Sequence, residues 1–151
     1  MAVLVQNRLQ SRVIDIHRIE TVTSGILEYV DLPDCEMSIL LVDDSEIQDI
    51  NRRYLGKDYA TNVISFPMAE GECGDLNTHM LGDVVVSVET ARRDAERAHI
   101  PVEDIIDYFL IHGLCHLLGY DHEQPGSDVA AMVKKEDEIF FALKGYVLER
   151  L

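Results

Sequence analysis

Apolar residues recur along this chain with two different periods, and the order of those periods predicts a mixed fold. Short runs rich in valine, isoleucine and leucine are typical of strands, and such runs stand at residues 2–5, 37–42, 63–66 and 81–88. Apolar positions three and four residues apart are typical of helices that bury one face, and they predict helices at residues 16–30, 45–55, 89–99, 102–118 and 127–143. Strands separated by helices, followed by helices in succession, predict an α/β (α+β) fold with a small mixed β-sheet covered by helices.

Polar residues and glycines mark the ends of several elements. Asp44 or Ser45 is the expected N-cap of the second helix, because a side-chain oxygen there accepts a bond from a free backbone N–H. Gly56 is expected to end that helix. Residues 68–80 are rich in Gly, Glu, Asp, Asn and Thr without periodicity, which indicates a surface loop.

Length and composition favour one soluble domain. The 151 residues are 47% hydrophobic and 27% charged, which suits a single globular domain spanning residues 1–151. The three cysteines, an odd number at unrelated spacings, are not the pattern of a disulfide framework. The N-terminal apolar run is too short for a signal peptide, and no run approaches the roughly 20 residues of a membrane span. We therefore expect a cytoplasmic protein with no membrane partner.

The formal net charge is -15. Because phosphate backbones attract basic surfaces, this charge argues against broad, non-specific binding of nucleic acid. A divalent cation with a few local arginines can still create a positive site on an acidic molecule.

Three of the six histidines stand close together near the end of the buried helix expected at residues 102–118. His112 and His116 are four residues apart, which places both side chains on one face of a helix. Gly119 can end the helix in a left-handed conformation, so that the chain turns back and brings His122 to the same ion. Three imidazoles with an open fourth position are typical of catalytic zinc, whose bound water has a pKa of about 7. Imidazole also suits nickel, copper and iron, so other divalent metals stay open.

This histidine spacing resembles the zincin-like helix of metzincin peptidases, in which two helical histidines are followed by glycine and a third histidine. Those peptidases need a glutamate directly after the first histidine as general base. Gly113 stands there instead, which disfavours peptidase activity by that mechanism. A metal hydrolase acting on a peptide or another substrate remains an alternative.

The whole string from His112 to His122, with Tyr120 and Asp121 before the last histidine, resembles the signature of the YbeY family of bacterial metal-dependent endoribonucleases. Residues 51–67 resemble a second hallmark of that family, and residues 81–84 resemble a third, weaker one. Cys115 stands where the family usually has leucine; we interpret it as a small buried hydrophobe, since it is rotated about 100° from His116.

The resemblance implies a single-strand-specific, metal-dependent endoribonuclease. It further implies a role with the ribosome, in maturation of ribosomal RNA at the small-subunit 3′ end and in ribosome quality control. Many family members carry an activity-linked arginine where this chain has Leu55. Arg52, Arg53 and Lys57 are the candidates for supplying that charge to RNA. The departure keeps open a third hypothesis, a non-enzymatic ribosome assembly factor with a structural metal.

The proton-transferring residue is the least defined part of the site. Asp121 and Glu123 flank His122, and each is a candidate for a general base or for a partner that orients an imidazole. We take Asp121 as the catalytic candidate and expect Glu123 to face solvent. Asp83 is either a third candidate or a residue of the turn at a strand end.

Overall fold

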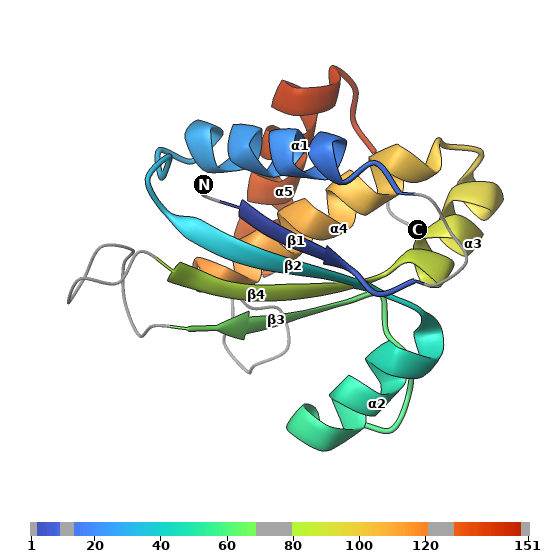
Figure 1. The fold of residues 1–151 in the computed structure, drawn as a ribbon. Coiled ribbons are helices and arrows are strands. Elements are labelled where there is room, and N and C mark those ends of the chain that lie inside the picture. Colours follow the sequence, from blue (N-terminus) through green and yellow to red (C-terminus); the bar gives the residue numbers. More distant parts are fainter. Residues whose placement is uncertain (1–2, 10–13, 69–79, 121–128, 149–151) are drawn as a thin grey trace.

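The computed structural model describes residues 3–9, 14–68, 80–120 and 129–148, and shows a sheet with helices on both sides (Figure 1). The strands are β1 (Val3–Asn7), β2 (Glu36–Val42), β3 (Val63–Pro67) and β4 (Met80–Ser87). The helices are α1 (Ile16–Tyr29), α2 (Asp44–Leu55), α3 (Val88–Ala98), α4 (Val102–Leu117) and α5 (Val129–Lys144). Every strand and helix expected from the apolar pattern is present, with ends shifted by at most a few residues.

The sheet is mixed, as predicted, and its strands lie in the order β1-β2-β4-β3. β1, β2 and β4 run parallel, and β3 pairs antiparallel with β4 from Val63 opposite Val86 to Pro67 opposite Gly82. The last strand in sequence therefore lies inside the sheet, and β3 forms an edge. Proline is compatible with such an edge because its missing N–H faces no partner strand.

The two faces of the sheet bury different side chains. On one face, Met37 and Ile39 of β2 and Val84 of β4 belong to the main core beneath α1, α3, α4 and α5 (Figure 1). On the other face, Val42 and Val85 form a smaller core with two isoleucines of α2. The alternation along each strand follows from the period of two that sends successive side chains to opposite faces.

α4 is the central helix, packed against β3, β4, α1, α3 and α5. It is apolar on most sides and buried, as predicted, with one charged exception: Asp107 is 0% exposed. Arg18 of α1 donates two hydrogen bonds of 3.0 Å to the Asp107 carboxylate, and Lys144 of α5 forms an ion pair with it. Because a buried carboxylate needs such partners, Asp107 ties α4 to α1 and α5.

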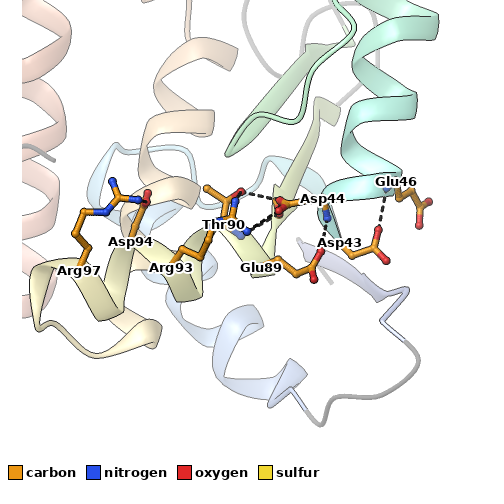
Figure 2. Close-up of polar contacts among 9 residues, drawn as sticks. Asp43, Asp44, Glu46, Glu89, Thr90, Arg93, Asp94 and Arg97 are labelled. Carbon is orange, nitrogen blue, oxygen red and sulfur yellow. Dashed lines mark hydrogen bonds and ion pairs between the residues drawn. The ribbon is translucent and has the colours of Figure 1, made fainter.

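α2 begins differently from the sequence expectation. The N-cap is Asp43, whose side chain accepts the Glu46 N–H at 2.8 Å, and neither Asp44 nor Ser45 fills that place. Asp44 is the first helical residue, and its carboxylate instead accepts hydrogen bonds from Thr90 at 2.7 Å and Arg93 at 2.6 Å in α3 (Figure 2). The expected stop at Gly56 is confirmed by its left-handed φ of 70°.

Two further expectations concern cysteines and membranes. Cys35 is disulfide-bonded, which the cysteine spacing did not predict, whereas Cys115 is a free thiol. Over the described ranges, no helix has the length and apolar character needed to cross a membrane. The loop expected at residues 68–80 lies outside the described residues apart from Met68 and Met80.

Candidate metal centre and adjoining cleft

His112 and His116 lie in the last two turns of α4, with their rings 4.7 Å apart between centroids and inclined at 78°. Their Nε2 atoms approach to 3.2 Å. The prediction that the four-residue spacing brings both side chains to one face of the helix is confirmed.

The separation of these two nitrogens can be compared with that required by a metal. Two imidazole ligands on a tetrahedral zinc, each with a Zn–N bond of about 2.0–2.1 Å, hold their donor atoms about 3.3–3.4 Å apart. The observed 3.2 Å fits this geometry closely. The same distance also suits a hydrogen bond between the two nitrogens, so the pair fits a metal without requiring one.

The third expected ligand, His122, lies outside the described residues, as do Asp121 and Glu123. Within the ranges that the structure describes, no group of three or more potential metal-ligating side chains occurs. The three-histidine site and the role of Asp121 therefore stay predictions.

The end of α4 turns the chain as expected from Gly119. The Gly119 N–H donates to the His116 carbonyl at 3.0 Å, and the Tyr120 N–H donates to the Cys115 carbonyl at 3.1 Å. These two bonds, with a φ of 102° at Gly119, form the turn that commonly follows a helix C-terminus. The turn is fixed immediately beyond the second histidine.

Glu136 of α5 is part of this site, although the sequence analysis did not select it. Its carboxylate contacts Nδ1 of His112, and the residue is 3% exposed. A signal for it exists in the sequence, because Glu136 stands four residues after Met132 and three before Ile139, on the apolar stripe of its helix. A carboxylate at a core position indicates a specific partner.

Gly113, which replaces the glutamate of the metzincins, has a packing role. A Cβ atom at this position would lie 2.6 Å from Cγ1 of Val84 and 3.2 Å from Oγ of Ser65. The Ser65 hydroxyl also donates to the Gly113 carbonyl at 2.9 Å. Glycine therefore lets α4 approach β3 and β4 closely, just where the histidines begin.

The environment of Cys115 favours the packing interpretation. The side chain is 0% exposed, and burial raises the pKa of its thiol to about 12, with the Glu136 carboxylate contributing to the rise. Metal ligation by cysteine requires the thiolate. Cys115 is thus a small core residue beside His116.

An open cleft of about 370 Å³ adjoins His116. Its walls come from the end of α2 and the segment after it, from β3, and from the turn after α4. Lys57, Tyr59 and Tyr120 contribute to the lining, and so does Leu55, which is 47% exposed. The position of Leu55 is therefore part of the cleft wall.

The three basic residues expected to contact RNA, which are Arg52, Arg53 and Lys57, do not line one common cleft. Lys57 lines the cleft with His116, whereas Arg52 lines a separate depression among acidic residues and pairs with Asp49 at 2.5 Å. Arg53 also pairs with Asp49, at 3.0 Å, and its guanidinium lies 5.6 Å from the centre of the Tyr54 ring.

Two other residues from the motifs are explained by the fold. Asn51 is 2% exposed and donates a 2.9 Å bond to the Tyr59 carbonyl, so it fixes the cleft wall that carries Tyr59. Asp83 lies within β4, opposite Ser38 and Phe66, and not in a turn at the end of the strand.

Known proteins resemble this chain in fold and in sequence. A solution structure, that of TM1509 from Thermotoga maritima, matches 95% of this chain and 89% of its own with a TM-score of 0.65 and 23% identity, which shows the fold. Endoribonuclease YbeY of Syntrophus aciditrophicus (strain SB) is 50% identical over 150 residues, which are 99% of this chain and 94% of that protein. Endoribonuclease YbeY of Geobacter sulfurreducens is 44% identical over 145 residues, covering 95% and 97% of the two chains. The family profile described as endoribonuclease YbeY matches residues 4–144, and the chain belongs to that family.

Proposed function

We propose that this protein is a zinc-dependent endoribonuclease that cleaves single-stranded RNA. The proposal includes the finer role implied by the motifs, namely maturation of ribosomal RNA at the small-subunit 3′ end and ribosome quality control. It places the protein in the cytoplasm, with the ribosome or ribosomal proteins as partners, and treats residues 1–151 as one hydrolase domain. The observation that carries the proposal is the convergence of the His112 and His116 Nε2 atoms beside an open cleft.

The ligands of the proposed zinc are His112, His116 and His122. When bound, the ion would supply a Lewis acid for a phosphoryl oxygen and an activated water for hydrolysis. His112 is held by Glu136 on the side away from Nε2, and His116 is held by the turn at Gly119. Asp121 is the proposed proton-transferring residue, because it directly precedes the third ligand in the sequence.

The lining of the cleft favours a single strand of RNA. Lys57 supplies a positive charge for a phosphate, and the aromatic rings of Tyr59 and Tyr120 offer faces on which unpaired bases can stack. Bases inside a duplex have no free face for such stacking. RNA contact is thus proposed for Lys57, and not for Arg52 or Arg53, which pair with Asp49 outside this cleft.

The proposal is tested by replacing one ligand and measuring metal and cleavage together. We expect His116→Ala to lose bound zinc and to lose cleavage of a single-stranded RNA oligonucleotide, while a duplex of the same sequence resists the unaltered protein. His17→Ala is the matched control, because the His17 side chain is 89% exposed on α1. A zinc-free His116→Ala protein that cuts RNA at the original rate would disprove the proposal.

One alternative has an observation in its favour. Leu55 lines the cleft where many family members have an activity-linked arginine, which suits an assembly factor that binds RNA or ribosomes without cutting. Zinc-loaded protein that binds single-stranded RNA but leaves it intact would favour that alternative. Activity on a peptide is disfavoured by Gly113, and release of peptide fragments by the zinc-loaded protein would reinstate it.

A further inference from the structure

Glu136 is an acidic side chain held inside an apolar surface. The residue is 3% exposed and lies on the face of α5 that also buries Met132, Ile139 and Phe140. Removing a carboxylate from water costs free energy unless hydrogen bonds or ion pairs inside the protein offset that cost. A leucine at this position would suit the core better, so the acidic group calls for a specific explanation.

The contact with His112 supplies that explanation. The Glu136 carboxylate meets Nδ1 of the imidazole, and Nε2 of the same ring points to Nε2 of His116. A carboxylate accepts a proton and cannot donate one when ionised. A proton on Nδ1 is the one that this carboxylate can accept, and the tautomer that carries it has no proton on Nε2.

We propose that Glu136 is a positioning residue that fixes the tautomer and the ring orientation of His112, so that Nε2 is presented to the metal. The inference rests on the proposed function only in taking His112 as a metal ligand. Glu136 itself touches neither the metal nor the RNA in this proposal; it acts through the imidazole.

The register between α4 and α5 holds Glu136 in place. On α5, Lys144 follows Glu136 by eight residues, and on α4, His112 follows Asp104 by eight residues. Eight residues span about 12 Å of helix. Lys144 pairs with Asp104 at 3.0 Å, while Glu136 contacts His112, so the two antiparallel helices are joined by polar contacts at matching intervals.

This spacing shows how α5 contributes to the site. A slide of one helix along the other would break both contacts at once, and the apolar residues between them oppose the same slide. The orientation of His112 is therefore set by a helix that follows it in the chain, in addition to the helix that carries it.

The inference is tested by comparing the zinc affinity of the protein with the stability of its zinc-free form. We expect Glu136→Leu to weaken zinc binding by about 10–100-fold in a chelator competition, the loss typical for a removed partner of a metal-ligating histidine. The urea midpoint of the zinc-free protein is measured in parallel, because Glu136→Leu also leaves the Nδ1–H of His112 without its acceptor, which destabilises the folded protein. A residue with only a structural role would lower the midpoint but leave the zinc affinity of the folded protein unchanged.

Two further variants define the role of the carboxylate. Glu136→Gln retains an oxygen that can accept the Nδ1 proton, so its zinc affinity should lie between those of Glu136→Leu and the unaltered protein. Glu138→Gln is the matched control: it carries the same substitution two residues later on α5, at a side chain that is 45% exposed. Its zinc affinity should equal that of the unaltered protein.

A direct measurement requires no substitution and decides the question even where Glu136→Leu fails to fold. Long-range proton–nitrogen correlation spectra of the zinc-free protein at neutral pH should show the His112 proton on Nδ1. A proton on Nε2, or a folded Glu136→Leu protein with unchanged zinc affinity, would overturn the inference. Because neither readout involves RNA, a protein that binds zinc as expected but cuts no RNA would refute the proposed function alone.

Discussion

Gly113 is the residue at which the shape of the site depends on a single missing side chain. In Gly113→Ala, the new Cβ would lie 2.6 Å from Cγ1 of Val84, a 0% exposed and β-branched residue with little freedom to move. We expect a loss of about 1–3 kcal/mol in the free energy of unfolding, as is typical for an overpacked core. Urea denaturation of the zinc-free protein measures this loss.

A second glycine provides the control for Gly113→Ala. A Cβ atom at Gly25, inside α1, would lie 3.6 Å from Leu143, which is an ordinary contact. Gly25→Ala should therefore stabilise the protein by about 0.5–1 kcal/mol, because alanine loses less conformational freedom in a helix. If Gly113→Ala were as stable as Gly25→Ala, the close packing of α4 on the sheet would not explain the glycine.

At the scale of single residues, the sequence predicted those features of the site that depend on helix geometry alone. The facing of His112 and His116 and the turn at Gly119 follow from residues within one turn of each other. Glu136 was missed because its contact with His112 joins two helices, and no spacing within one helix reports it. Its place on an apolar stripe was visible, but the identity of its partner was not.

At the scale of elements, Asp44 connects α2 to the strand and helix that precede α4. Its carboxylate accepts hydrogen bonds from Thr90 at 2.7 Å and Arg93 at 2.6 Å (Figure 2). It also accepts one from the Ser87 hydroxyl at 2.6 Å. Burial raises the pKa of Asp44, but these hydrogen bonds and the charge of Arg93 outweigh burial and bring the pKa below its ordinary value. The ionised form is thus favoured in the folded protein.

This lowered pKa predicts a loss of stability in acid. A carboxyl group with a lower pKa in the folded state stabilises the protein fully above its unfolded pKa of about 3.9, and this contribution disappears as the pH falls through the folded-state value. Asp44→Asn should therefore be less stable than the unaltered protein at neutral pH, and the difference should shrink below a pH of about 4. Urea unfolding across this range measures the difference.

The control for Asp44→Asn lies on the neighbouring helix. Asp94 of α3 forms a long, 3.9 Å ion pair with Arg97, whose side chain is 71% exposed (Figure 2), and such surface pairs contribute little. Asp94→Asn should change the stability only slightly at any pH. A constant difference between Asp44→Asn and the unaltered protein down to the acid limit would contradict the assigned role of Asp44.

The apolar content of each strand also bears on the order of the strands in the sheet. β4 is apolar on both faces, with Val84 and Val86 in the main core and Val85 in the smaller one, which is typical of a central strand. β1 alternates between more and less buried residues, which is typical of a strand with one face toward solvent. Strand direction could not be inferred, because it depends on where each connection crosses the sheet.

The ion pairs of α2 bear on which basic residues are proposed to contact RNA. Arg52 and Arg53 were candidates for RNA because they are basic, yet Asp49 precedes them by three and four residues on α2. Residues at these spacings are neighbours on a helix surface. This pairing was readable from the sequence, whereas the location of Lys57 in the cleft required the fold.

At the scale of the whole molecule, a net charge of -15 must be reconciled with an RNA substrate. The described residues that line the cleft include one lysine and no arginine. Each phosphate neutralised by a protein cation contributes about −0.7 to the slope of log affinity against log salt for single strands. RNA binding by this protein should therefore depend weakly on salt, in contrast to a protein with a broad basic surface.

The salt dependence of RNA binding distinguishes the contribution of the charged side chain in the cleft from that of the aromatic side chains. Lys57→Met should reduce the slope by about 0.7, the value for one phosphate contact. Tyr59→Ala removes a ring that is 53% exposed in the cleft, and should weaken binding by about 1–3 kcal/mol per stacked base without changing the slope. Fluorescence anisotropy of a labelled single strand, with zinc present throughout, measures both quantities. Lys135→Met is the control for lost charge alone, because Lys135 of α5 is 31% exposed, pairs with Glu138 and does not line the cleft. If Lys135→Met reduced the slope as much as Lys57→Met does, the effect would come from the overall charge, and RNA would not be bound in this cleft.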